Sequence, residues 1–148
     1  NLETKKTEVA DKIKSDLEIE KNTEIGKINN TTTYPDLSDD ELKSFKKEIN
    51  NAKDSDEIKD IIKEYDLLNE KNKTLKTIEE NCPYLIKDNI EFDKIKEKLN
   101  NVTKKDAFKT VLTDALIANT RLKAKIDDLI SEEKWDNGRV GIFMDQLK

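Results

Sequence analysis

Apolar residues recur along most of this chain at intervals of three and four positions, the spacing that places side chains on one face of an α-helix. One short segment carries such a face at Leu42, Phe45, Ile49 and Ala52. A second stripe starts at Ile58 and is sustained for about twenty further residues. The pattern predicts helices at about residues 4–29, 39–52, 54–80, 89–102 and 104–133.

The same pattern occurs twice. A shift of fifty residues places Phe45 on Ile95 and the pair Asn50-Asn51 on Asn100-Asn101 without a gap. Further along, Asn69 falls on Asn119 at the same shift. A period of this length is typical of arrays in which small helical units stack on their neighbours.

Signals for helix starts follow each of the two prolines. Ser38 and Glu41 have the spacing of a capping box, in which each side chain binds the other residue's backbone amide. Asp88 and Glu91 have the same spacing in the second copy. Two further helix starts are predicted, one where Asp54 precedes Glu57 and one where Thr103 precedes Asp106.

These elements predict an all-α fold, with two tandem three-helix units that share the helix at 54–80 and form an elongated rod. The first unit would span residues 1–80 and the second residues 54–133. Residues 134–148 would be a tail or the start of a further unit, with a short helix after Gly138 as one alternative.

Composition agrees with narrow helical units, since 34% of the residues are hydrophobic and 41% are charged. The net charge of -5 argues against binding to nucleic acid, and no apolar run reaches the length of a membrane span. With no histidine and the single thiol of Cys82, we expect no internal disulfide, no metal site and no cofactor. No catalytic motif is apparent, so we expect a protein that is not an enzyme.

The string Ile49–Lys53, a short turn, and then Ile58, Ile61 and Ile62 resemble the core of the GA module, the three-helix albumin-binding repeat of bacterial surface proteins. Leu68-Asn69 extends the pattern toward the related FIVAR repeats of large surface adhesins. The resemblance implies helical rods on a cell surface, some of which bind host proteins. The abundance of Asn, Lys and Ile is similar to that of mycoplasma-type surface lipoproteins.

In the GA module the albumin-binding surface lies on the second helix and the turn into the third. Carried over by position, the resemblance implies partner-binding residues at Phe45, Asn50, Asn51, Ala52, Lys53, Ile58, Ile61 and Ile62. The residues themselves leave a structural alternative open, in which the apolar positions form the core and the asparagines satisfy a helix end. Trp135 is a separate candidate for an interface anchor, because aromatic residues dominate binding hot spots.

The leading hypothesis is a surface-exposed, non-enzymatic adhesin region that binds a host protein, either serum albumin or a protein of the extracellular matrix or cell surface. We expect it at the cell surface, anchored through a lipoprotein or secretory signal upstream of this segment. Two alternatives stay open: a passive stalk or spacer of a surface lipoprotein, and a coiled-coil scaffold that self-associates.

Overall fold

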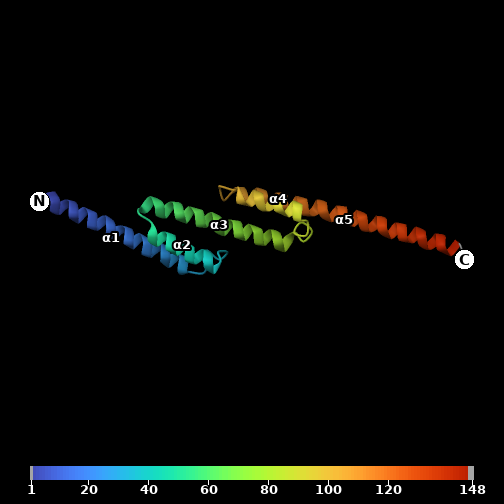
Figure 1. Ribbon diagram of the computed structural model, residues 1–148, viewed down its shortest axis with the longest axis horizontal. Helices are drawn as coiled ribbons and strands as arrows, with labels where there is room; N and C mark the ends of the chain where they lie inside the picture. Colours follow the sequence, from blue (N-terminus) through green and yellow to red (C-terminus); the bar gives the residue numbers. More distant parts are fainter. Residues whose placement is uncertain (1, 147–148) are drawn as a thin grey trace. The chain divides into compact units, whose positions relative to one another are not determined.

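The computed structural model describes the backbone of residues 2–146 and the side chains of residues 2–132. The fold is all-α, and no strand occurs within the described backbone. The described backbone contains five helices, which are labelled in Figure 1: α1 (Leu2–Asn29), α2 (Asp39–Asn51), α3 (Ser55–Asn81), α4 (Asn89–Asn100) and α5 (Ala107–Gln146).

The predicted bounds of the first four helices agree with the observed ones to within two residues. The last helix differs at both ends, because α5 begins at Ala107 and continues to Gln146. A separate short helix after Gly138 is therefore wrong, because α5 is continuous through that position, while the assignment of residues 134–148 to a tail or to a further unit stays a prediction. Both prolines lie far upstream, and Gly138 and Gly141 each cost only about 1 kcal/mol relative to alanine inside a helix.

The capping box at the start of α2 is confirmed. The Ser38 hydroxyl accepts a hydrogen bond from the Glu41 amide at 3.1 Å, and the Glu41 carboxylate accepts one from the Ser38 amide at 2.9 Å. At the start of α4, Asp88 accepts a hydrogen bond from the Glu91 amide at 3.1 Å. These bonds satisfy amides that the first turn of a helix otherwise leaves without a partner.

The chain forms two compact units, residues 1–73 and residues 74–148, and the division falls within α3. The backbone of α3 is nevertheless one uninterrupted helix from Ser55 to Asn81. The predicted helix at 54–80 therefore exists, and its longer N-terminal part belongs to unit 1 while its last residues, from Thr74, belong to unit 2.

Unit 1, residues 1–73, has an aromatic centre. The Phe45 side chain is completely buried and its ring stacks on Tyr65, with centroids 4.4 Å apart and 5° between the planes. Tyr34 meets Phe45 edge-on at 5.1 Å. Helices α1, α2 and α3 all contribute to this core, which contains Ile28, Tyr34, Leu37, Phe45, Ile49, Ala52, Ile58 and Tyr65.

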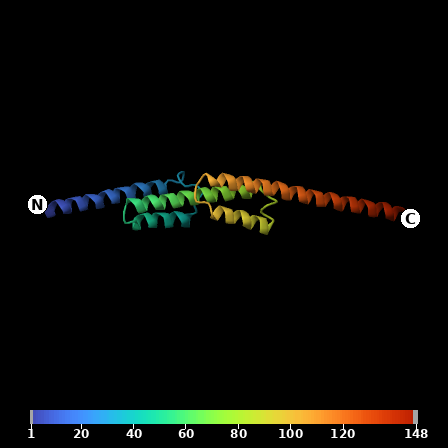
Figure 2. The ribbon, with the colours of Figure 1, turned by 90° about the horizontal axis from the view of Figure 1, so that it is seen from above.

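In unit 2, residues 74–148, α4 packs against the first half of α5 (Figure 2). Among the described side chains of unit 2, the buried hydrophobic ones are Ile78, Cys82, Leu85, Ile95, Leu99, Phe108, Val111, Ala115 and Ala118. Cys82 is free and completely buried, and this burial raises the pKa of its thiol. The Cys82 thiol is therefore shielded from pairing with another chain while unit 2 is folded.

A side-chain amide holds the loop before the short helix in each unit. The Asn69 carbonyl accepts a hydrogen bond from the Asp36 amide at 2.9 Å. Asn119, fifty residues later, accepts hydrogen bonds from the Tyr84 and Leu85 amides at 2.9 and 3.1 Å. Each asparagine ties the loop that follows a proline to a long helix of its own unit.

Replacing either asparagine with alanine should loosen only its own loop. For Asn119→Ala we expect the Tyr84 and Leu85 amides to exchange with deuterium at least tenfold faster, since unpaired buried amides cost about 1–3 kcal/mol. Asn69→Ala should instead accelerate exchange at Asp36.

Each variant is the control for the other, and NMR-detected exchange reads both loops in one experiment. Equal acceleration in both loops from a single substitution would contradict this assignment.

Candidate partner-binding surface

Three of the predicted partner-binding residues lie inside unit 1. The exposed fractions of Phe45, Ala52 and Ile58 are 0%, 4% and 0%. Ile61 and Ile62 are half-buried and pack against the same core. The apolar residues of the predicted set therefore pack in or against the core of unit 1. This is the alternative in which these positions form the core and do not contact a partner.

The polar members of the set lie on the surface. Asn50, Asn51 and Lys53 are exposed at the end of α2 and in the turn that leads to α3. We call these three residues the turn surface. It is the part of the predicted site that a partner can reach without unfolding unit 1.

Hydrogen bonds fix the backbone of this turn. Asp54 accepts a bond from the Glu57 amide at 2.8 Å, and the Glu57 carboxylate accepts one from the Lys53 amide at 2.6 Å. The Ala52 amide bonds to the Ile49 carbonyl at 3.2 Å. The turn is therefore held in one conformation by its own side chains and backbone.

Residues of helix α1 form hydrogen bonds with both sides of the turn. The ammonium of Lys21 donates to the Asn50 carbonyl at 2.9 Å, although Lys21 is only 8% exposed. The Ser55 hydroxyl donates to the Glu20 carboxylate at 2.9 Å. A buried cation needs such a partner, so Lys21 ties the end of α2 to α1.

Sequence reasoning missed Lys21 and Glu20. The available signal was the position of Lys21 in the apolar stripe of α1, four residues after Leu17 and four before Ile25. The ammonium of a lysine at such a position either extends past the apolar side chains into water or reaches a hydrogen-bond acceptor. In this structure it reaches the Asn50 carbonyl.

The equivalent turn of unit 2 also exposes two asparagines, Asn100 and Asn101. The Asn101 amide ends α4 by bonding to the Glu97 and Lys98 carbonyls at 3.1 and 3.2 Å. In both units the asparagine pair thus ends a short helix and keeps its side chains at the surface.

Trp135, the remaining predicted anchor, lies outside the residues whose side chains the structure describes. Among the described residues, no cluster of potential metal ligands occurs. No helix in the described part of the chain is long and apolar enough to cross a membrane.

Two tyrosines in the core of unit 1 are held in their neutral form. Burial raises the pKa of Tyr65, and the hydrogen bond that its hydroxyl donates to Glu48 raises it further. Burial, together with the negative charges of Asp66 and Glu24, raises the pKa of Tyr34. The folded unit therefore opposes the loss of either proton.

Comparisons with known proteins add no family to this description. No family model matches the sequence, and neither the curated proteins nor the solved structures contain a significant match.

The tyrosines predict a loss of stability at high pH. A group whose pKa is higher in the folded state than its ordinary 10.0 stabilises that state below pH 10, and this stabilisation is lost as the pH rises above it. The melting temperature from circular dichroism should fall above pH 10, and the fall should be smaller in Tyr65→Phe.

The same two proteins compared at about pH 8, where Tyr65 is protonated in both the folded and the unfolded chain, give the baseline for this difference. Identical profiles for Tyr65→Phe and the native chain would show that Tyr65 does not contribute.

Proposed function

We propose that this chain is a non-enzymatic binding region of a bacterial surface protein, and that its turn surface recognises an extracellular host protein. In this proposal the two units are tandem copies of one three-helix building block that share α3 and form a rod. The continuity of α3 and the shift of fifty residues between Asn69 and Asn119 support that arrangement.

One observation carries the proposal. Asn51 and Lys53 are exposed on a turn whose backbone is fixed by Asp54, Glu57 and, through α1, Lys21. Binding to a fixed surface loses little conformational entropy, so a few polar contacts suffice for useful affinity. Asp54 and Glu57 make the same kind of helix cap as Ser38 and Glu41 make at α2, and they support the proposal by keeping the turn surface in one conformation.

The second unit offers the same residue types at the equivalent turn, Asn100 and Asn101. Two such surfaces on one chain would raise the overall affinity for a partner that presents several copies of its epitope, as matrix proteins do. Serum albumin, which presents one copy, would have to bind to a single turn.

The passive stalk is the second candidate. It is favoured by the burial of Phe45, Ala52 and Ile58, which removes from the surface most of the apolar contacts that the resemblance implied. The two candidates differ in whether the turn surface contacts anything outside the chain.

Binding to immobilised serum albumin and fibronectin, measured by biolayer interferometry, distinguishes the two. We expect a dissociation constant in the micromolar range for at least one of them, and Asn51→Lys should raise it about tenfold. The contacts are short-range and polar, so the native complex should survive at high salt.

Asn22→Lys is the matched control, because it makes the same substitution at an exposed asparagine in the second half of α1. It should bind as the native chain does. If neither protein bound at about 10 µM, or if both variants weakened binding equally, the proposal would fail and the stalk would be favoured.

A further inference from the structure

Unit 2 contains a hollow of about 530 Å³, between the start of α4 with the loop before it and the later part of α5. Leu122, Ile126 and Leu129 line it from α5, and Ile90 lines it from the start of α4. Ligand sites in proteins commonly have volumes of about 300–1,000 Å³. The hollow is therefore large enough for one small molecule with an apolar part.

Two lysines also line the hollow. Lys87 comes from the loop before α4 and Lys125 comes from α5, and both side chains are exposed. Among the described residues, neither ammonium forms an ion pair. Two cations beside an apolar surface favour a ligand that combines an anionic group with an apolar chain.

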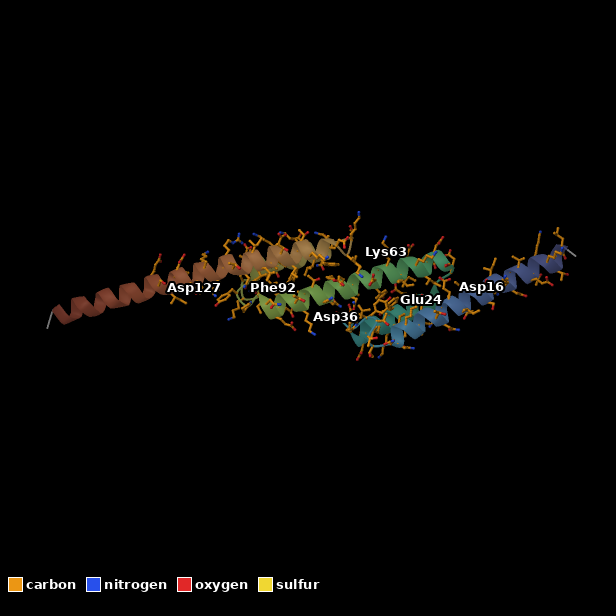
Figure 3. The ribbon with its side chains drawn as sticks, turned by 180° about the vertical axis from the view of Figure 1, so that it is seen from behind. Asp16, Glu24, Asp36, Lys63, Phe92 and Asp127 are labelled. Atoms are coloured by element: carbon orange, nitrogen blue, oxygen red, sulfur yellow. The ribbon has the colours of Figure 1, made fainter. Side chains whose placement is uncertain are left out.

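The acidic residues near the hollow leave this positive charge in place. Asp88 is the only acid among the described lining residues, and its carboxylate already accepts a hydrogen bond from the Glu91 amide at 3.1 Å. The Glu91 carboxylate pairs with Arg121 at 3.2 Å. Figure 3 shows Asp127 on the part of α5 that extends past Phe92 of α4, and Asp127 is not among the residues that line the hollow.

The first copy of the repeat differs at these positions, and the difference follows polarity. At the shift of fifty residues, the four apolar lining residues Ile90, Leu122, Ile126 and Leu129 fall on Asp40, Asn72, Lys76 and Glu79. The two lysines, Lys87 and Lys125, fall on Leu37 and Leu75. The second copy therefore combines apolar residues with lysines where the first copy has polar residues with leucines.

Two of these counterparts make contacts within unit 1. Leu37 belongs to the core and is only 7% exposed. Asn72 donates hydrogen bonds to the Asp36 carbonyl at 3.0 Å and to the Glu41 carboxylate at 2.9 Å. In unit 2 the equivalent residues, Lys87 and Leu122, line the hollow instead.

We propose that this hollow binds a free single-chain amphiphile with an anionic head group, the chemical class of the fatty acids. Its aliphatic chain lies along α5 over Leu122, Ile126 and Leu129, and burial of its methylene groups supplies most of the affinity. Its head group contacts the ammoniums of Lys87 and Lys125.

The lysines decide between this occupant and an uncharged one. A purely apolar molecule would cover part of two ammoniums without pairing them, which is unfavourable. A cationic amphiphile would place like charges together, which costs free energy as well. An anionic head group avoids both costs.

Titration of the full chain with dodecanoate, followed by NMR at about pH 8 where the carboxylate is ionised, tests the proposal. The backbone amide signals of residues 84–90 and 122–129 should shift, with a dissociation constant below about 1 mM. The signals of residues 34–40 in unit 1 are the internal control and should not shift.

Three related compounds test the two parts of the ligand. Octanoate should bind at least about tenfold more weakly, since each buried methylene group contributes about fourfold to affinity. Dodecyltrimethylammonium, which has the same chain and a cationic head, should bind at least about tenfold more weakly as well. Dodecyl phosphate should bind, and its affinity relative to dodecanoate identifies the preferred anionic head group.

Replacing the lysines tests their role. Lys87→Gln with Lys125→Gln should raise the dissociation constant for dodecanoate about tenfold and remove the preference over the cationic compound. Lys109→Gln with Lys123→Gln is the matched control, because it removes two exposed lysines of α5 that do not line the hollow. It should bind dodecanoate as the native chain does.

Replacing the apolar residues tests the chain-binding part. Ile126→Asn with Leu129→Asn should also raise the dissociation constant about tenfold. Ile117→Asn is the matched control, since Ile117 is a 61% exposed residue of α5 that does not line the hollow. Circular dichroism checks that every variant keeps its helix content.

No shift up to about 1 mM dodecanoate would overturn the proposal, as would equal binding of the cationic compound or equal shifts in unit 1. Shifts at the hollow on changing the concentration of the protein alone would also overturn it, because a second copy of the chain would then be the occupant. The proposal does not rest on host-protein binding, since neither Asn51 nor Lys53 lines the hollow.

Discussion

The narrow apolar face of each helix is the constraint on which this structure depends. In a chain that is 41% charged, no helix has enough apolar surface to fold by itself, so each must share a core with its neighbours. In unit 1, α1, α2 and α3 meet around Phe45, which is completely buried between Tyr34 and Tyr65. Where a neighbour ends before its partner does, as α4 does beside α5, the apolar face is left exposed.

The polar contacts of the fold position the loops between the helices. Asn69 and Asn119 hold the loops after the two prolines, and Lys21 reaches from α1 to the end of α2. No described buried side-chain nitrogen or oxygen lacks a hydrogen-bond partner. Fixed turns of this kind are a suitable platform for recognition, because their exposed side chains need no further ordering when a partner binds.

Helix positions and caps were predictable from sequence because they depend on local rules. The spacing of apolar residues located α1 to α4, and the pair Ser38 and Glu41 predicted the start of α2. The bond from Lys21 to Asn50 was not predictable, since it joins residues 29 positions apart and depends on how α1 and α2 cross. The continuation of α5 to Gln146 was missed because the apolar pattern fades there while nothing stops the helix.

The candidate site was predictable only in part. The resemblance to a binding module marked one stretch of chain, and burial divided it into core residues such as Ile58 and exposed residues such as Asn51. Periodicity alone does not distinguish an apolar residue that packs from one that binds, because both favour the same face of a helix.

The central claim is that one continuous helix, α3, belongs to unit 1 as far as Lys73 and to unit 2 from Thr74 onward. Carbon-13 chemical shifts of the Cα atoms across residues 66–78 test it most directly. The account predicts downfield helical shifts at every one of these residues, including Lys73 and Thr74 at the division between the units. Shifts near coil values at those two residues would show a break in the helix and would contradict the account.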